Sequence, residues 1–201
     1  MLDAHLRQWI DPPLNRLGRR LARAGIGANA VTLAGLAIGL AAAAAIAAGQ
    51  FALALGLVLV SRLADGLDGA VARATVRTDF GGYLDIAADF AFYGAVPLAF
   101  AVLDPGANAL AAAFLLFAFY VNGTTFLGLA VMAARAGVEG TRQGLKSLHY
   151  SSGLLEGTET IAFLVAICIV PTLFVPLAWV FGALCLVTAV ARLAGAWTAF
   201  R

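Results

Sequence analysis

The chain consists mainly of long apolar stretches separated by short polar segments. A helix that crosses a bilayer needs ~20 mainly apolar residues. Stretches of about this length lie near 28–49, 51–73, 78–103, 107–134, 152–171 and 174–198. We therefore predict an all-α membrane protein with six transmembrane helices. Residues 28–198 would form one bundle, and residues 1–201 a single membrane domain.

The first 25 residues have a different pattern. Apolar side chains recur there at helical spacing, and arginines occupy the other side. The apolar set is Leu2, Leu6, Trp9, Ile10, Leu14, Leu17 and Leu21. We expect residues 1–25 to form an amphipathic helix at the membrane interface. Two interpretations stay open: the helix only anchors the chain to anionic headgroups, or it also closes the side of an active site.

The distribution of Lys and Arg among the loops predicts the orientation. These cations lie before the first span, after the second and fourth spans and at the C-terminus, whereas the other three loops hold none. Loops rich in Lys and Arg stay in the cytoplasm. We expect an integral protein of the bacterial inner membrane with both termini and the active site on the cytoplasmic side. Arg62 is an exception, because it lies inside the second span.

Composition narrows the choice of class. Of the 201 residues, 62% are hydrophobic and only 12% are charged, whereas charged residues make up about a quarter of a soluble domain. The net charge of +2 and the lack of a basic-aromatic pattern argue against nucleic acid as a partner. Cys168 and Cys185 lie in apolar runs, where isolated cysteines are packing residues rather than a disulfide framework.

Four aspartates interrupt the second and third apolar stretches. Asp65 and Asp68 share one face of a helix with a period of 3.6 residues, and so do Asp85 and Asp89. The two predicted helices are antiparallel and joined by a short loop, so the acidic faces can meet. Aspartate oxygens are preferred ligands of Mg²⁺ and Mn²⁺. Two such pairs can hold two ions, which can clamp a phosphoryl group.

Small and basic residues accompany the acids. Gly69, Ala72 and Gly81 leave room for a substrate to approach, and Arg73 can bind a phosphate group. A purely structural alternative pairs Arg62 with Asp65 and Arg73 with Asp68. Because nearby cations are too few to neutralise four carboxylates, we favour metal-dependent phosphate chemistry at a membrane surface.

These residues resemble a family signature. Asp65-x-x-Asp68-Gly69-x-x-Ala72-Arg73, followed by Gly81-x-x-x-Asp85-x-x-x-Asp89, is similar to that of the CDP-alcohol phosphotransferases (CDP-alcohol phosphatidyltransferases). The six predicted spans and the preceding amphipathic helix also match this family. One departure is the spacing between Arg73 and Gly81, where this chain has seven residues, 74–80, and the family usually has eight.

The resemblance implies an activity and roles. Members transfer a substituted phosphate from a CDP-linked donor to an alcohol and release CMP, and they are commonly homodimers. Asp65, Asp68, Asp85 and Asp89 would bind metal, and Asp89 would also be the catalytic base. Gly69, Ala72, Arg73 and Gly81 would bind the donor. Asn29 and Thr32 resemble the start of the family's first span, although a polar helix start explains them equally well.

The acceptor side is less defined. Arg142, Lys146, Glu156 and Glu159 are candidates for binding an acceptor alcohol, because intramembrane carboxylates usually have a function. The glutamates could instead pair with Arg62, Arg135 or Arg192. Asn122, Thr124 and Thr125 are expected to hydrogen-bond between helices, and lining the pocket is the alternative.

Several functions fit the sequence. We favour phospholipid synthesis with CDP-diacylglycerol as the donor. The nearest alternative is an enzyme that uses a soluble CDP-alcohol with a lipid acceptor. A membrane prenyltransferase fits less well, because its two acidic motifs lie far apart. A carboxylate-based ion transporter would need a polar path through several spans.

Overall fold

The computed structural model of the protein describes residues 2–137 and 157–200, with the backbone alone at 2–10. All regular elements in these ranges are helices. They are α1 (Leu2–Arg23), α2 (Ala28–Ala47), α3 (Phe51–Ala74), α4 (Asp79–Leu103), α5 (Pro105–Arg135), α7 (Gly157–Ile169), the 3₁₀ turn η1 (Pro171–Leu173) and α8 (Phe174–Ala199). The predicted all-α class is therefore confirmed for the described residues, and the predicted helix limits that fall in these ranges agree within a few residues.

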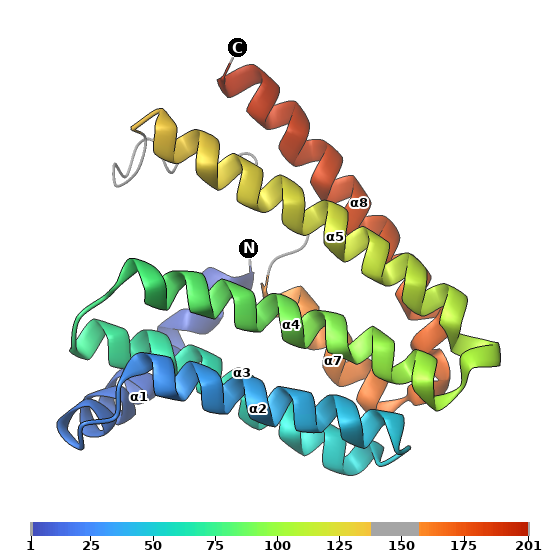
Figure 1. The fold of residues 1–201 in the computed structure, drawn as a ribbon, viewed down its shortest axis with the longest axis horizontal. Coiled ribbons are helices and arrows are strands. Elements are labelled where there is room, and N and C mark those ends of the chain that lie inside the picture. Colours follow the sequence, from blue (N-terminus) through green and yellow to red (C-terminus); the bar gives the residue numbers. More distant parts are fainter. Residues whose placement is uncertain (1, 138–156, 201) are drawn as a thin grey trace.

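The helices form two groups that meet along α4. In the first group α3 and α4 make their main contacts with α2, and α1 lies against α3; in the second, α5 packs along α8 (Figure 1). Helix α4 also contacts α5, and α7 packs on α3. The sequence led us to expect α3 and α4 as directly paired neighbours. They are instead held by a common partner, and side chains bridge the space between them.

Small residues allow α2 to approach α3 and α4 closely. A Cβ atom at Gly39 would lie 2.7 Å from the Phe92 ring and 2.9 Å from the Ser61 Oγ. Ser61 also donates a hydrogen bond of 2.8 Å to the Gly35 carbonyl oxygen. Close approach through small residues is the usual way in which helices associate in lipid.

The apolar core lies in the half of the bundle that is remote from the aspartates. Stacked rings of Phe100 and Phe174, with centroids 4.0 Å apart, join α4 to the start of α8. Ile46, Val58 and Leu115 are fully buried around them. The aspartates lie in the other half of the bundle, in the second half of α3 and the first half of α4. Each of these two helices therefore has an apolar half and a polar half.

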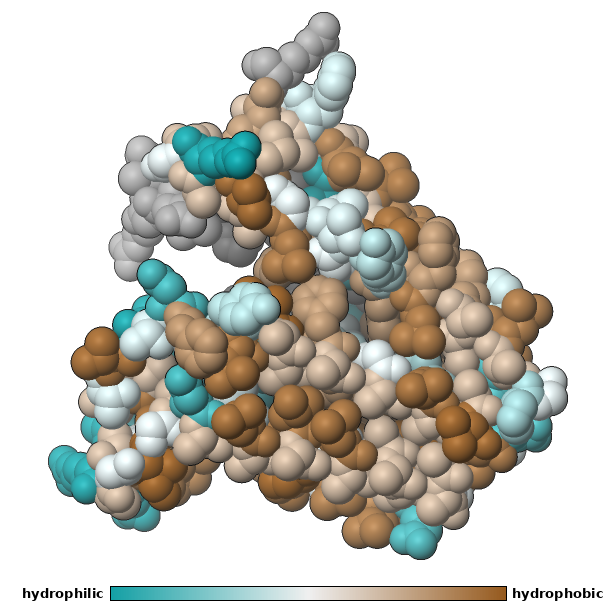
Figure 2. All heavy atoms as spheres, in the orientation of Figure 1, coloured by the Kyte–Doolittle hydropathy of each residue, from teal (hydrophilic) through white to brown (hydrophobic). Residues whose placement is uncertain are grey.

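The apolar surface of the molecule agrees with the prediction of a membrane protein. Figure 2 shows apolar residues over most of one face, with hydrophilic residues more frequent toward the ends of the helices. Large apolar side chains such as Leu110 and Val190 expose 73% and 65% of their surface, which suits contact with lipid.

Four helices in the described parts of the chain are long and apolar enough to cross a membrane: α2, α4, α5 and the segment Pro171–Ala199 that contains α8. Helix α3 has 24 residues, but Arg62, Asp65, Asp68 and Arg73 lower its hydropathy. Helix α7 has 13 residues, and the predicted start of its span at 152 lies outside the described residues. The count of six spans and the interfacial position of α1 therefore stay predictions.

Candidate functional site

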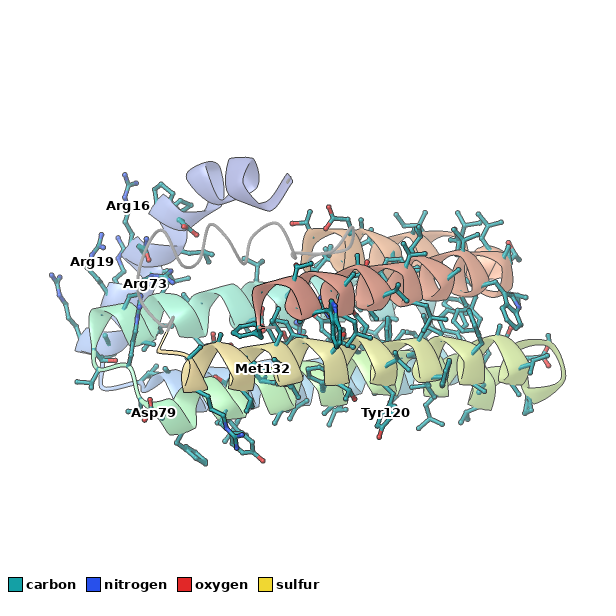
Figure 3. The ribbon with its side chains drawn as sticks, turned by 90° about the horizontal axis from the view of Figure 1, so that it is seen from above. Arg16, Arg19, Arg73, Asp79, Tyr120 and Met132 are labelled. Atoms are coloured by element: carbon teal, nitrogen blue, oxygen red, sulfur yellow. The ribbon has the colours of Figure 1, made fainter. Side chains whose placement is uncertain are left out.

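The polar ends of three helices meet at one place. The second half of α3 supplies Asp65 and Asp68, and the first half of α4 supplies Asp85 and Asp89. Because both helices pack on α2, the first turns of α2 lie beside these acids. Helix α1 covers the same end of α3. Arg16 and Arg19 of α1 extend from this end of the molecule, and Arg73 and Asp79 also lie there (Figure 3).

The structure brings the four carboxylates together. Asp65 of α3 and Asp89 of α4 both contact the Arg62 Nη1, at 3.5 and 2.7 Å. Asp68 and Asp85 are close enough to interact electrostatically with Asp65. Asp85 likewise interacts with Asp68 and Asp89. The acidic faces predicted from helical periodicity therefore share one space between α3 and α4. Within the described residues, however, no group of three or more Asp, Glu, His or Cys side chains is arranged to hold a metal ion.

A threonine of α2 holds one of the acids. Asp68 exposes only 5% of its surface, and the Thr32 hydroxyl donates a hydrogen bond of 2.6 Å to its Oδ2. The sequence assigned Thr32 to donor binding or to an ordinary helix start. Its contact fixes the orientation of a buried carboxylate, and its role in donor binding stays a prediction.

Arg62 contacts two of the four aspartates. Its Nη1 lies 2.7 Å from the Asp89 Oδ1 and 3.5 Å from the Asp65 Oδ1. The predicted alternative that Arg62 pairs with Asp65 is thus confirmed, but its shorter contact is with Asp89. The sequence could not reveal that partner, because it lies on another helix and depends on which way a long side chain turns.

Arg73 does not pair with Asp68, so that part of the structural alternative is wrong. Its Nε and Nη2 donate hydrogen bonds of 3.2 and 2.9 Å to the Asn15 Oδ1 of α1. A Cβ atom at Gly69 would lie 3.3 Å from the Arg73 Nη1. Arg73 is exposed, which leaves its guanidinium accessible to a ligand. Sequence reasoning did not single out Asn15.

The start of α4 is set by Thr78. The Thr78 Oγ1 accepts a hydrogen bond of 3.0 Å from the Gly81 amide, as a helix N-cap residue does. A Cβ atom at Gly81 would lie 3.2 Å from the Asn29 Oδ1. Asn29 and Gly81, both assigned to donor binding, therefore lie against each other. Ala72, the remaining predicted donor contact, is partly buried on α3.

A second polar group joins α5 to α8. Arg192 exposes 7% of its surface and donates hydrogen bonds of 2.9 Å to the Asn122 side chain and the Thr125 hydroxyl. The expected interhelical bonding of Asn122 and Thr125 is confirmed. Thr124 instead bonds to the Tyr120 carbonyl of its own helix.

The candidate acceptor residues are mostly outside the described ranges. Arg142, Lys146 and Glu156 fall within 138–156. Glu159 lies in the first turn of α7, a helix that contacts α3 and α1. Their assignment to the acceptor stays a prediction.

The donor atoms of these residues are of the type that a hard divalent cation prefers, although no three of the described side chains are arranged around one position. Four carboxylates share one space, and Arg62 is the described cation within 4.0 Å of them. One guanidinium balances only part of this negative charge. Carboxylate oxygens are the donors that Mg²⁺ and Mn²⁺ favour, so the donor chemistry fits such an ion.

Comparisons with known sequences find several similar proteins. A family model described as CDP-alcohol phosphatidyltransferase matches residues 26–194. The "Inner membrane protein YnjF" of Escherichia coli (strain K12) is 45% identical over 192 residues, covering 96% of this chain and 93% of that protein. An "Archaetidylinositol phosphate synthase" of Pyrococcus horikoshii is 39% identical over 85 residues, which are 42% of this chain and 45% of that protein.

Solved structures share the fold. The Mycobacterium tuberculosis phosphatidylinositol phosphate synthase (PgsA1) in complex with manganese and citrate superposes with a TM-score of 0.74 at 23% identity, covering 92% of this chain and 89% of that chain. The same synthase with CDP-DAG bound gives a TM-score of 0.73 at 24% identity, with 92% and 94% covered.

Proposed function

Since the chain belongs to the CDP-alcohol phosphatidyltransferase family and is a transferase, we propose that it transfers phosphatidyl from CDP-diacylglycerol to a small polar alcohol and releases CMP. One observation carries this proposal: Asp65 of α3 and Asp89 of α4 lie within 3.5 Å of the same Arg62 nitrogen, at the polar end of the bundle. Such a site suits the charge of a diphosphate only when divalent cations are present. We propose Mg²⁺ or Mn²⁺, in two positions.

The donor would be a lipid. PgsA1, which shares the fold, was solved with CDP-DAG bound. A lipid donor can enter from the bilayer while its nucleotide stays in the headgroup layer. Arg73, which is exposed, would bind the diphosphate. Gly69, Ala72 and Gly81 would leave space for the nucleotide, with Asn29 beside Gly81.

Asp65, Asp68, Asp85 and Asp89 would hold the metal. A manganese complex of PgsA1 supports a divalent ion in this fold. When bound, the ions would neutralise the diphosphate and lower the barrier to departure of CMP. Thr32 would keep Asp68 oriented through its 2.6 Å hydrogen bond.

Asp89 would act as the base. It would accept the proton of the acceptor hydroxyl while the hydroxyl oxygen attacks the phosphorus remote from cytidine. The new P–O bond forms as the bond between that phosphorus and the bridging oxygen breaks, and the electron pair leaves with CMP. This route requires no covalent intermediate with a side chain.

The acceptor would bind on the side of residues 142–159. Arg142 and Lys146 suit an acceptor that carries its own phosphate group, whereas Glu156 and Glu159 suit one rich in hydroxyls or bearing an amine. Both archaetidylinositol phosphate synthases that match part of the chain support a polyol phosphate as the first compound to test.

We propose the bacterial inner membrane as the location, with both termini and the active site facing the cytoplasm. The name of the E. coli relative supports an inner membrane protein, and the Lys and Arg distribution supports the orientation. A homodimer formed through the membrane helices is also proposed, by analogy with the family.

The test is CMP release by purified protein with CDP-diacylglycerol, Mg²⁺ or Mn²⁺ and a panel of acceptors that includes polyols, polyol phosphates and amino alcohols. Asp89→Asn keeps the shape of the side chain and removes the base. We expect the variant to fold and to lose transfer by at least ~100-fold, within the range of general base catalysis.

Full transfer by Asp89→Asn would exclude Asp89 as the base. A second donor panel of soluble CDP-alcohols with diacylglycerol as acceptor tests the nearest alternative. If only the soluble CDP-alcohols supported activity, the donor would be a soluble CDP-alcohol and not CDP-diacylglycerol. Family membership sets aside the prenyltransferase and ion-transporter alternatives.

A further inference from the structure

Arg62 occupies an unusual position for a membrane arginine. Only 8% of its side chain is exposed, and the Phe92 ring centroid lies 4.3 Å from its guanidinium carbon. Phe92 is itself fully buried. The guanidinium therefore contacts both the apolar core, at Phe92, and the acidic cluster, at Asp89 and Asp65.

The helix geometry explains why Arg62 reaches both acidic helices. Arg62 precedes Asp65 by three residues, or about 4.5 Å along α3. On the antiparallel helix α4, Asp89 lies deeper in the bundle than Asp85. Arg62 and Asp89 thus meet at the deep end of the cluster, where the Arg62 Nη1 contacts the Asp89 Oδ1 at 2.7 Å.

Other contacts hold the guanidinium in place. The Arg62 Nη2 donates a hydrogen bond of 3.2 Å to the Ser61 Oγ, and Ser61 is anchored to the Gly35 carbonyl of α2. The side chain is thereby fixed with respect to three helices. The Arg62 Nε is buried and has no hydrogen-bond partner among the described atoms, so the carboxylate contacts are the main compensation for burying this charge.

A second buried arginine has different partners among the described residues. Arg192 is buried to a similar degree and is held by the neutral Asn122 and Thr125. Within the described parts of the chain, the contacts with Asp89 and Asp65 therefore distinguish Arg62 from Arg192.

We propose that Arg62 is a positioning residue and an internal counter-cation of the acidic site. It fixes one oxygen of Asp89, so that the other stays directed toward the reacting groups. It also compensates part of the carboxylate repulsion when no divalent ion is bound, and it opposes divalent ions that enter the same cluster. This inference rests on the proposed metal site.

The proposal predicts opposite effects on metal binding and turnover. In Arg62→Met a positive charge near the ions is removed, so Mn²⁺ should bind about tenfold more tightly or better. Asp89 loses its orientation, so kcat at saturating Mn²⁺ and donor should fall about 10- to 100-fold. Arg62→Lys keeps the charge, and its Mn²⁺ affinity should stay within about twofold of the unmodified protein's.

The measurements are Mn²⁺ binding by electron paramagnetic resonance and thermal unfolding in detergent, with EDTA or saturating Mn²⁺. Because bound Mn²⁺ compensates for the lost guanidinium, Arg62→Met should be destabilised more in EDTA than in Mn²⁺. Arg192→Met is the matched control: its loss of thermal stability should be the same in both conditions, and its Mn²⁺ affinity unchanged.

Equal Mn²⁺ affinity in Arg62→Met and the unmodified protein, or weaker affinity in the variant, would overturn the proposal. An equal loss of stability with and without Mn²⁺ would also overturn it, because a packing role alone predicts that result. If Arg62→Met does not fold, Arg62→Gln, which can still hydrogen-bond to Asp89, enters the same comparison. Failure of the unmodified protein to bind Mn²⁺ would instead contradict the proposed metal site.

Discussion

Asp68 and Thr32 illustrate how one hydroxyl determines the geometry of a buried acid. Asp68 exposes 5% of its surface, and Thr32 donates to it across 36 residues of sequence. A buried carboxylate that loses such a donor is destabilised, because water cannot replace the hydrogen bond. This contact makes Thr32 a support of the acidic cluster.

Thr32→Val tests this role, since valine keeps the shape and removes the hydroxyl. We expect a loss of about 1–3 kcal/mol, measured as a lower temperature of thermal unfolding in detergent with EDTA. Thr32→Ser keeps the donor and should retain most of the stability. If Thr32→Val lost transfer activity without any loss of stability, Thr32 would instead contact the donor.

The sequence predicted the positions of some side chains in the site and missed the contacts of others. Asp65, Asp68, Asp85 and Asp89 follow helical periodicity, and periodicity alone places them on two faces that can meet. The pairing of Arg62 with Asp89 spans 27 residues, and that of Arg73 with Asn15 spans 58. Such contacts depend on how helices pack, which the local pattern does not contain.

At the scale of elements, α1 is attached to α3 through small residues. A Cβ atom at Gly18 would lie 2.8 Å from the Ala70 carbonyl carbon and 3.0 Å from its oxygen, and one at Gly66 would lie 3.1 Å from Leu14. The close contact at Gly18 involves backbone atoms, which cannot move aside as a flexible side chain can. The position of α1, and with it the Asn15–Arg73 hydrogen bonds, depends on glycine at 18.

Gly18→Leu should therefore displace α1 from α3. We expect Arg73 to lose its support from Asn15, which raises KM for the CDP-linked donor by about 3- to 10-fold, as expected for one or two exposed hydrogen bonds. Gly56→Leu is the control, because a Cβ atom there meets nothing within 4 Å. Unchanged donor KM in Gly18→Leu would mean that α1 serves only as an anchor.

The whole molecule shows which features of the fold the sequence could predict. The helices follow the apolar stretches, because a backbone in lipid must satisfy its hydrogen bonds within the helix. The central position of α2 was not predicted, because hydropathy shows where an apolar stretch lies and not which helices it packs against. Only the small residues Gly35 and Gly39 mark the face of α2 that approaches α3 and α4.

The orientation in the membrane depends on α3, the long helix whose charges lower its hydropathy. If α3 spans the bilayer, Gln50 before it and Arg77 after it lie on opposite sides. We expect Gln50→Cys to react with a membrane-impermeant maleimide added to spheroplasts, and Arg77→Cys to react only after the membrane is permeabilised. Cys168 and Cys185 are buried, so the unmodified protein should give little background. Labelling of both positions from one side would contradict a spanning α3 and the six-span topology. It would also remove the argument that the acidic cluster faces the cytoplasm, since that argument requires the ends of α3 to be separated by the bilayer.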